Sequence, residues 1–219
     1  MKILISGYGK MGKEIEKELK QHELFIVSKE NGLTYKNIKE EIDVIIDFSS
    51  HEAIYNIQEY LIDKKNTSLI IGTTNYSDLE SEVIKEISKN HTVVMFANFS
   101  KGVNLLYKLV EVISTYLKDE NIYLIEKHHK YKKDFPSGTS KTIKEIIDYP
   151  VNILEIKSGE IIGTHELDVY FENERLSLVH EAFSRRAFVE GVIQAVNIIK
   201  TLPIGLYDRE NLNLWKETK

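Results

Sequence analysis

The stretch Lys2-Ile3-Leu4-Ile5-Ser6-Gly7-Tyr8-Gly9-Lys10-Met11-Gly12 stands at the start of the chain and decides the fold of its first half. Its first residues form an apolar run of strand length, and Gly7–Gly12 follow directly as a Gly-x-Gly-x-x-Gly turn. Apolar side chains then recur every four positions between Lys10 and Gln21, which predicts a helix with one apolar face. A glycine turn that joins a strand to a helix in this way is typical of dinucleotide-binding domains.

Each glycine of this turn has a physical role in such a domain. Gly7 permits the tight turn, Gly9 lets the backbone approach a pyrophosphate, and Gly12 allows the helix to pack closely on the sheet. The helix N-terminus adds free N–H groups and a partial positive charge. We therefore predict that the turn binds a dinucleotide, against the alternative of a purely structural glycine turn.

Two charged residues follow the second apolar run, about where an acidic side chain would contact the adenosine ribose. Glu30 could accept hydrogen bonds from the ribose hydroxyls, and Lys29 could neutralise a 2′-phosphate. Both could equally be solvated charges of a turn. The sequence therefore leaves NADH and NADPH open as cofactors.

The rest of the first hundred residues alternates short apolar runs with amphipathic stretches. Further strands are predicted at Leu24–Val27, Asp43–Phe48, Leu69–Gly72 and Thr92–Phe96, and helices at about His51–Lys64 and Ser77–Lys89. Strands this apolar are buried on both faces, as in a parallel sheet covered by helices. The pattern predicts a Rossmann-like, doubly wound α/β domain. In such a sheet Asp47-Phe48-Ser49 and Gly72-Thr73-Thr74 face the ligand crevice, although ordinary turn chemistry would explain either alone.

The second half of the chain has a different texture. Helices are predicted at about Val103–Leu117, from Gly138 to Ile147 and at Arg186–Lys200, with a strand at Ile122–His128. Apolar residues alternate with period two between Asn152 and Phe183, which is typical of antiparallel strands with one covered face. The fold class is therefore a Rossmann-like domain plus an α+β domain with a mostly antiparallel or mixed sheet.

A short basic segment carries the chemistry we expect of the second domain. Residues 127–133 hold four lysines and two histidines, a patch that would concentrate an anionic substrate. His128 could donate a proton, with Lys132 as its electrostatic partner. Ser137 is placed to cap the next helix, where the amides of Gly138 and Thr139 could dock a carboxylate. A solvated loop is the plainer alternative, and a metal site is weaker because no third ligand accompanies the histidines.

Composition excludes several classes of function. The net charge of −5 is too acidic for a general nucleic-acid binder, and the absence of cysteine excludes disulfides, thiolate zinc sites and cysteine nucleophiles. The start of the chain lacks the pattern of a signal peptide, and no apolar run approaches the roughly 18 residues of a membrane span. We expect a cytoplasmic protein without membrane or nucleic-acid partners.

Glu-x-His-His-x-x-Lys-x-Asp-x-Pro-Ser-Gly-Thr at 126–139 resembles the signature of the 4-hydroxy-tetrahydrodipicolinate reductase (dihydrodipicolinate reductase) family. The resemblance covers nearly the whole chain in order. It includes the glycine turn, the two strand-end segments named above, and the blocks 97–104, 163–166, 180–185 and 205–208.

The resemblance implies a reaction and a set of roles. The family reduces a cyclic dicarboxylate imine with NADH or NADPH and loses a hydroxyl as water. His128 would be the proton donor and acceptor, with Lys132 as a second proton donor, and the substrate would lie on His129, Ser137, Gly138 and Thr139. The cofactor would lie on Ser6, Gly7, Tyr8, Gly9, Lys10, Met11, Gly12, Gly72, Thr73, Thr74, Phe96, Ala97, Asn98 and Phe99. Lys29 and Glu30, predicted above from their position after the second strand, complete the expected cofactor residues.

The resemblance also implies the organisation of the protein. Residues 1–98 with about 189–219 would form the dinucleotide domain, and about 99–188 the domain that binds substrate and builds a homotetramer. Two departures stand out: Asn75 replaces a glycine of the family, and the stretch from Asn31 to Ile42 is short. Asparagine tolerates left-handed backbone, so we expect the turn at Asn75 to survive.

Three alternatives remain beside this interpretation. The first is a nicotinamide-dependent reductase for another small dicarboxylate. The second is a dinucleotide sensor without catalysis, which would not need His128 and Lys132 beside an anion-docking helix start. The third is a basic-loop nucleic-acid binder, which one short patch without interleaved stacking aromatics supports poorly.

Overall fold

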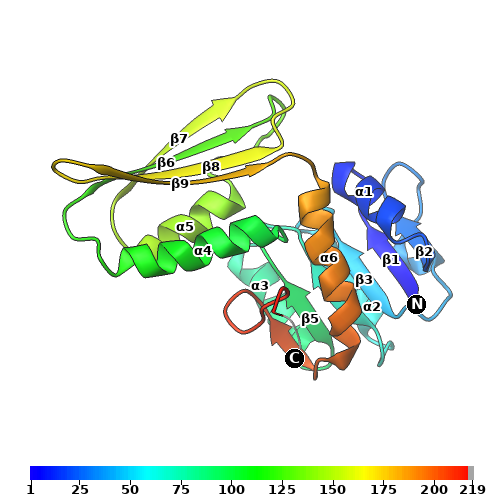
Figure 1. Cartoon of the computed structure of the whole chain (residues 1–219). Coiled ribbons are helices and arrows are strands. Elements are labelled where there is room, and N and C mark those ends of the chain that lie inside the picture. Colours follow the sequence, from blue (N-terminus) through cyan, green and yellow to red (C-terminus); the bar gives the residue numbers. More distant parts are fainter. Residues whose placement is uncertain (217–219) are drawn as a thin grey trace. The chain divides into compact units, whose positions relative to one another are not determined.

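The structure is a computed structural model, and it describes residues 1–216. Contacts divide the chain into two compact units (Figure 1). Unit 1 comprises Met1–Phe99 and the chain from Phe188 onward, and unit 2 comprises Ser100–Ala187. Among the described residues, no helix is long and apolar enough to cross a membrane.

Unit 1 is built on a parallel sheet of six strands in the order β10-β5-β4-β3-β1-β2. The strands are β1 (Lys2–Ser6), β2 (Glu23–Val27), β3 (Val44–Asp47), β4 (Ser68–Ile71), β5 (Thr92–Met95) and β10 (Gly205–Tyr207). Strands β3 and β4 are buried along their whole length. This confirms the doubly wound, Rossmann-like fold, because continuous burial requires helices on both faces.

Two helices pack on each face of this sheet. On one face α1 (Lys10–Glu18) and α6 (Arg186–Ile198) share a core with Ile3 and Ile5. On the other, α2 (Ala53–Leu61) and α3 (Asp78–Ser88) pack with Leu4 and Ile45. The 3₁₀ turns η1 (Tyr35–Asn37) and η2 (Ile199–Thr201) complete the unit.

The sixth strand, β10, is absent from the sequence-based prediction. It has three residues, begins with a glycine and lacks the apolar run that marks the other strands. It is ordered by pairing with β5, where Leu206 lies opposite Val93. Tertiary pairing, rather than local sequence pattern, therefore places residues 205–207 in this sheet.

Unit 2 is a mixed sheet of four strands, in the order β7-β6-β8-β9, with helices on one face. The strands are β6 (Asn121–His128), β7 (Val151–Lys157), β8 (Gly163–Tyr170) and β9 (Arg175–Ala182), and the helices are α4 (Lys101–Ser114) and α5 (Gly138–Ile147). Side chains of Ile122 and Leu124 on β6 form the core with Val110 of α4 and Ile143 of α5.

The prediction of antiparallel strands from Asn152 onward holds for β8 and β9 but is wrong for β7. Strand β7 pairs with β6 in parallel, with Ile122 opposite Val151. The reason is the connection, since α5 lies between the two strands and carries the chain back to the same end of the sheet.

Candidate active site

The glycine turn of unit 1 has the geometry of an anion cradle. Gly7 has a φ of +89°, and a Cβ there would lie 2.5 Å from the carbonyl oxygen of Phe48. A Cβ at Gly12 would lie 2.2 Å from the carbonyl oxygen of Gly7, so only glycine lets α1 approach this closely. Gly9 caps α1, whose first turn carries no acidic side chain. No carboxylate in the first turn of α1 would therefore compete with a phosphate for the N–H groups of the helix start.

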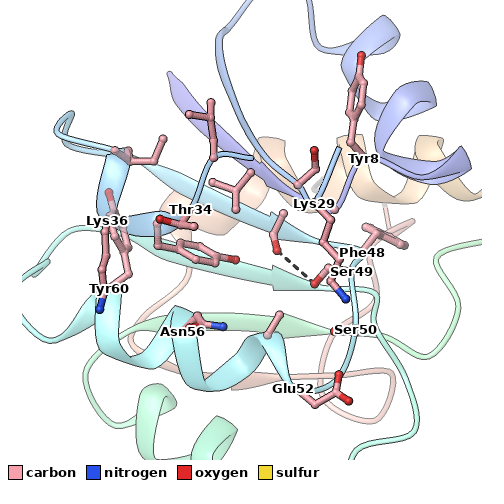
Figure 2. A pocket seen from close by; sticks show the side chains of 18 of the residues that line it. Tyr8, Lys29, Thr34, Lys36, Phe48, Ser49, Ser50, Glu52, Asn56 and Tyr60 are labelled. Carbon is pink, nitrogen blue, oxygen red and sulfur yellow. Dashed lines mark hydrogen bonds between the residues drawn. The ribbon is translucent and has the colours of Figure 1, made fainter. Parts of the chain in front are cut away.

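A pocket of about 1180 Å³ opens beside this turn (Figure 2). Its volume exceeds the usual range for drug-sized ligands, as a dinucleotide would require. Predicted cofactor residues that line it are Ser6, Gly7, Tyr8, Gly9, Lys29 and Glu30. Its far side is formed by η1 and α2, including Thr34, Asn56 and Tyr60, which the sequence analysis did not single out.

The other predicted cofactor residues lie outside the lining of this pocket. They are Lys10, Met11, Gly12, Gly72, Thr73, Thr74, Phe96, Ala97, Asn98 and Phe99. The side chains of Phe96 and Phe99 belong to the core, with ring centroids 5.4 Å apart, so only their backbone could contact a cofactor. Asn75 has a φ of +64°, the left-handed conformation expected from the sequence.

A fully buried carboxylate ties three strand ends of unit 1 together. Asp47 accepts hydrogen bonds from the hydroxyls of Ser6 at 2.7 Å, Ser49 at 2.5 Å and Thr73 at 2.6 Å. Burial raises the pKa of Asp47, whereas these three donors lower it, and the pKa stays above its ordinary value. The network fixes the edge of the sheet from which the cofactor pocket opens. The Thr73 side chain therefore has a structural role, as a donor to Asp47, and it does not line the pocket.

Lys29 and Glu30, which follow β2, carry opposite charges beside the pocket. Glu30 forms an exposed ion pair with Lys13 of α1, with 3.6 Å between Nζ and Oε2. Lys29 and Glu30 both line the pocket. The structure thus brings a cation and an anion to the position where a ribose or a 2′-phosphate is read in such folds.

In unit 2, a buried carboxylate holds the start of α5. Glu126 is fully buried, and each of its oxygens lies 3.1 Å from the backbone nitrogen of Ser137, which donates to them. The Ser140 hydroxyl donates to the same carboxylate. The Ser137 hydroxyl accepts from the Ser140 amide at 3.2 Å, which confirms Ser137 as the N-cap. Gly138 and Thr139 follow as the first helical residues, as the sequence predicts.

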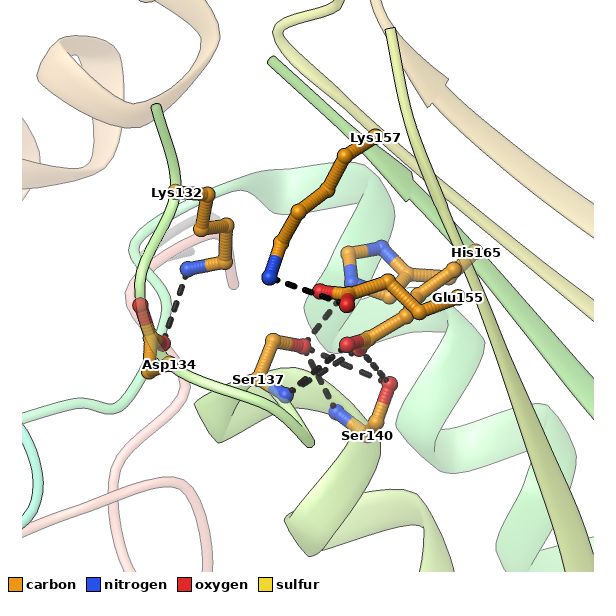
Figure 3. A network of polar contacts seen from close by, with 8 residues as sticks. Lys132, Asp134, Ser137, Ser140, Glu155, Lys157 and His165 are labelled. Carbon is orange, nitrogen blue, oxygen red and sulfur yellow. Dashed lines mark hydrogen bonds and ion pairs between the residues drawn. The ribbon is translucent and has the colours of Figure 1, made fainter. Parts of the chain in front are cut away.

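The proposed proton donors lie at and after the end of β6. His128 is 6% exposed, and burial lowers its pKa, with the charge of Lys132 as the second cause. Lys132 forms an ion pair with Asp134 at 2.8 Å (Figure 3). Burial alone would raise the pKa of Asp134, but Lys132 brings it below its ordinary value. His129 is half-buried, with its ring 6.5 Å from that of Tyr131.

Two further histidines extend this site, and the sequence analysis gave them no role. The ring of His165 lies 5.4 Å from that of His128, and the ring of His180 lies 6.1 Å from that of His165. The sequence could have identified them by position. Both histidines fall on the inward-facing positions of alternating strands, where apolar residues are expected. In the described part of the chain, no three His, Cys, Asp or Glu side chains are grouped to hold a metal ion.

Comparison with known proteins covers both units. A family model described as dihydrodipicolinate reductase, N-terminus, matches residues 1–99, and one described as dihydrodipicolinate reductase, C-terminus, matches residues 102–212. The 4-hydroxy-tetrahydrodipicolinate reductase of Caldanaerobacter subterraneus subsp. tengcongensis is 32% identical over 97% of this chain and 98% of its own. That of Aquifex aeolicus is 34% identical over 75% of this chain and 71% of its own.

A solved structure shares the fold. The dipicolinate-bound dihydrodipicolinate reductase from Paenisporosarcina sp. TG-14 superposes with a TM-score of 0.73 at 18% identity, covering 97% of this chain and 99% of its own. At that identity the likeness concerns the fold alone. The two family models, which together account for nearly the whole sequence, show that this chain belongs to the dihydrodipicolinate reductase family.

Proposed function

We propose that this chain reduces 4-hydroxy-tetrahydrodipicolinate to tetrahydrodipicolinate in diaminopimelate and lysine synthesis. As a member of the family it is a nicotinamide-dependent oxidoreductase. The reaction takes up one hydride and one proton and releases the hydroxyl group as water. The observation that carries the proposal is that the match spans both units, one with the dinucleotide turn and one with the basic site.

Unit 1 fits the cofactor. A nicotinamide dinucleotide would supply the hydride, and Gly7, Gly9 and the start of α1 would hold its pyrophosphate. This assignment is supported by the close approach at Gly12 and by the pocket beside the turn. The backbone of Phe96–Phe99 and the strand-end residues Gly72–Thr74 would bound the nicotinamide end.

Unit 2 fits a dianionic substrate. One carboxylate would accept hydrogen bonds from the amides of Gly138 and Thr139, in a helix start that Glu126 and the Ser137 cap keep in place. Lys132 and His129 would contribute to the recognition of negative charge. A helix N-terminus suits this task because its amides and dipole favour an anion without requiring a proton.

His128 would deliver the proton. Its lowered pKa means that the free protein holds this ring neutral near pH 7, so it has to take up a proton when substrate binds. A bound dicarboxylate would favour that uptake, because nearby negative charge stabilises the imidazolium. Lys132 would share the donor role and, through its ion pair with Asp134, keep a fixed position.

The proposal is tested with purified protein and substrate made by the preceding synthase, following oxidation of the reduced nicotinamide. His128→Gln and Lys132→Ala should each lower kcat on the order of a hundredfold, the usual range for lost acid catalysis. Dinucleotide binding should change little. The matched control is Lys133→Ala, since Lys133 is the exposed neighbour of Lys132. Wild-type turnover retained in both site variants would remove the proton-donor assignment.

For cofactor choice, we propose that both NADH and NADPH are accepted. Lys29 would stabilise a 2′-phosphate and Glu30 would accept from ribose hydroxyls, and both line the pocket. Lys29→Ala should then raise KM for NADPH alone, and Glu30→Ala should raise KM for NADH alone. If either variant raised KM for NADH and KM for NADPH equally, these separate roles of Lys29 and Glu30 would be wrong.

For assembly, we propose a homotetramer formed through the open face of the unit 2 sheet. Leu154, Ile156 and Val179 are 49%, 47% and 61% exposed and lie on the face away from α4 and α5. Exposed apolar sheet surface of this kind is typical of subunit interfaces. Val179→Glu should lower the mass measured by light scattering, whereas the control Ile62→Glu, in unit 1, should leave it unchanged.

A further inference from the structure

A row of polar side chains crosses the helix-covered face of the unit 2 sheet. Strand register places Glu155, Glu126, His165 and His180 directly opposite one another on neighbouring strands. Two residues further along β8, Leu167 fills the same face as part of the core. A buried polar row within an apolar layer costs free energy unless its members serve one another or a ligand.

His165 lies at the centre of this row and is 4% exposed. Its ring stands nearly perpendicular to that of His128, at 72° with centroids 5.4 Å apart. Its Nε2 lies 3.4 Å from the hydroxyl of Ser137, the N-cap of α5 (Figure 3). One side chain therefore contacts both the proposed proton donor and the proposed carboxylate dock.

His165 is unsuited to donating the proton itself. Burial, followed by the neighbouring His128, His180 and Lys132, lowers its pKa to about 3. It therefore stays neutral across the pH range in which such an enzyme works. Three carboxylates near His128, those of Glu126, Asp134 and Glu155, favour the protonated form of the His128 ring. Lys157, which lies opposite His128 on β7, is paired with Glu155 at 2.9 Å. A neutral ring among them supplies shape and a polar contact rather than charge.

We infer that His165 is a positioning residue, which holds the His128 ring and the Ser137 turn in one fixed relation. The inference rests on the proposed function, because it concerns the same reaction. Its two contacts are of different kinds, a ring against a ring and a nitrogen against a hydroxyl. Substitutions can therefore remove them one at a time.

His165→Phe keeps an aromatic ring beside His128 but loses the contact with Ser137. It should raise KM for the substrate about fivefold, the effect of one modest hydrogen bond, and leave kcat nearly unchanged. His165→Gln keeps a polar group at the reach of Nε2 but loses the ring. It should lower kcat on the order of tenfold through misplacement of His128, and leave KM nearly unchanged. His91→Phe is the matched control, because it replaces a buried histidine of unit 1 that belongs neither to the expected cofactor residues nor to the site in unit 2.

Two measurements without turnover separate this inference from the proposed function. Dipicolinate binding by calorimetry should weaken in His165→Phe and not in His165→Gln. Imidazole ¹⁵N NMR of the ligand-free protein should show altered His128 signals in His165→Gln and not in His165→Phe. Unchanged His128 signals in His165→Gln would overturn the inference. So would the same changes of kcat and KM in His165→Phe and His165→Gln. If the wild-type protein showed no turnover, the proposed function would be overturned instead. The NMR comparison would still test whether His165 positions the His128 ring, because it needs no turnover.

Discussion

Both carboxylate oxygens of Glu126 lie 3.1 Å from the backbone nitrogen of Ser137, so a fully buried strand residue holds the N-cap of α5. The Ser140 hydroxyl donates to the same carboxylate. A buried carboxylate is costly unless hydrogen bonds satisfy its oxygens, and a helix start is costly unless its N–H groups find acceptors. Strand and turn therefore stabilise each other, and the turn presents the amides of Gly138 and Thr139.

We predict that Glu126→Gln weakens dicarboxylate binding and destabilises the protein. The new NH₂ group would face donors from Ser137 or Ser140, leaving a buried polar group unsatisfied, at a cost of about 1–3 kcal/mol. Urea denaturation measures the stability loss, and calorimetry with dipicolinate measures the binding. Glu166→Gln is the control, since its ion pair with Lys127 at 3.3 Å is partly exposed and is worth about 0–1 kcal/mol. Equal effects of the two substitutions would show that Ser137 does not depend on Glu126.

The glycine turn allows a prediction that separates folding from cofactor binding. Gly12→Ala should destabilise unit 1, because the new Cβ would lie 2.2 Å from the carbonyl oxygen of Gly7. Gly9→Ala should fold normally, because a Cβ there meets no atom of the described residues within 4 Å. It should nevertheless weaken dinucleotide binding, since the Cβ would stand where the pyrophosphate approaches. Thermal unfolding and fluorescence titration with NADH measure the two effects, and normal NADH affinity in Gly9→Ala would place the cofactor elsewhere.

The fold of unit 1 was largely predictable because its signals are local. The apolar run of β1, the glycine turn and the four-residue spacing in α1 all lie within the first two dozen residues. Strand β10 could not be predicted in this way, because Gly205–Tyr207 form a strand only by pairing with β5, more than a hundred residues earlier. The parallel pairing of β7 could not be predicted from the residues of β7 either, because it follows from the helix α5 that connects β6 to β7.

The part of the candidate site that lies within one short segment could be predicted from the sequence. His128, Lys132 and Ser137 lie within ten residues, so chemistry and spacing identify them together. His165 comes from β8 and joins the site only through strand register and side-chain packing. Asp47 and its three hydroxyl donors were missed as a network for the same reason, since they meet only when three strand ends are brought side by side.

Lys132 should control the proton affinity of His128. Burial is the first cause of the lowered pKa of His128, and the positive charge of Lys132 is the second. Lys132→Met should therefore raise this pKa toward its ordinary value without reversing the whole shift. A ¹⁵N NMR titration of the ligand-free protein measures it directly. Lys133→Met is the control, because Lys133 is exposed and is not among the causes of the shift. An unchanged His128 titration in Lys132→Met would exclude electrostatic coupling between the two groups.

The pair formed by His51 and Glu80 predicts how the stability of unit 1 depends on pH. His51 Nδ1 lies 2.7 Å from Glu80 Oε1, and this hydrogen bond is the first cause of both shifts. It raises the pKa of His51 above 6.5, and it lowers the pKa of Glu80 from 4.5 to about 2. The histidine contribution is complete below pH 6.5 and is lost as the pH rises through its raised pKa. The carboxylate contribution is complete above pH 4.5 and is lost as the pH falls toward about 2.

His51→Gln should therefore reduce the free energy of unfolding most between pH 4.5 and pH 6.5, and progressively less on either side. Urea denaturation of wild type and variant across this range measures the difference. Glu86→Gln, which breaks the exposed pair with Lys89 on α3, provides the control. Its effect should stay small and constant from about pH 6 to pH 8, because a solvent-exposed ion pair contributes little to stability. If the difference caused by His51→Gln were equally constant over that interval, the ion pair would not be its source, and the loss would have to come from packing at the start of α2.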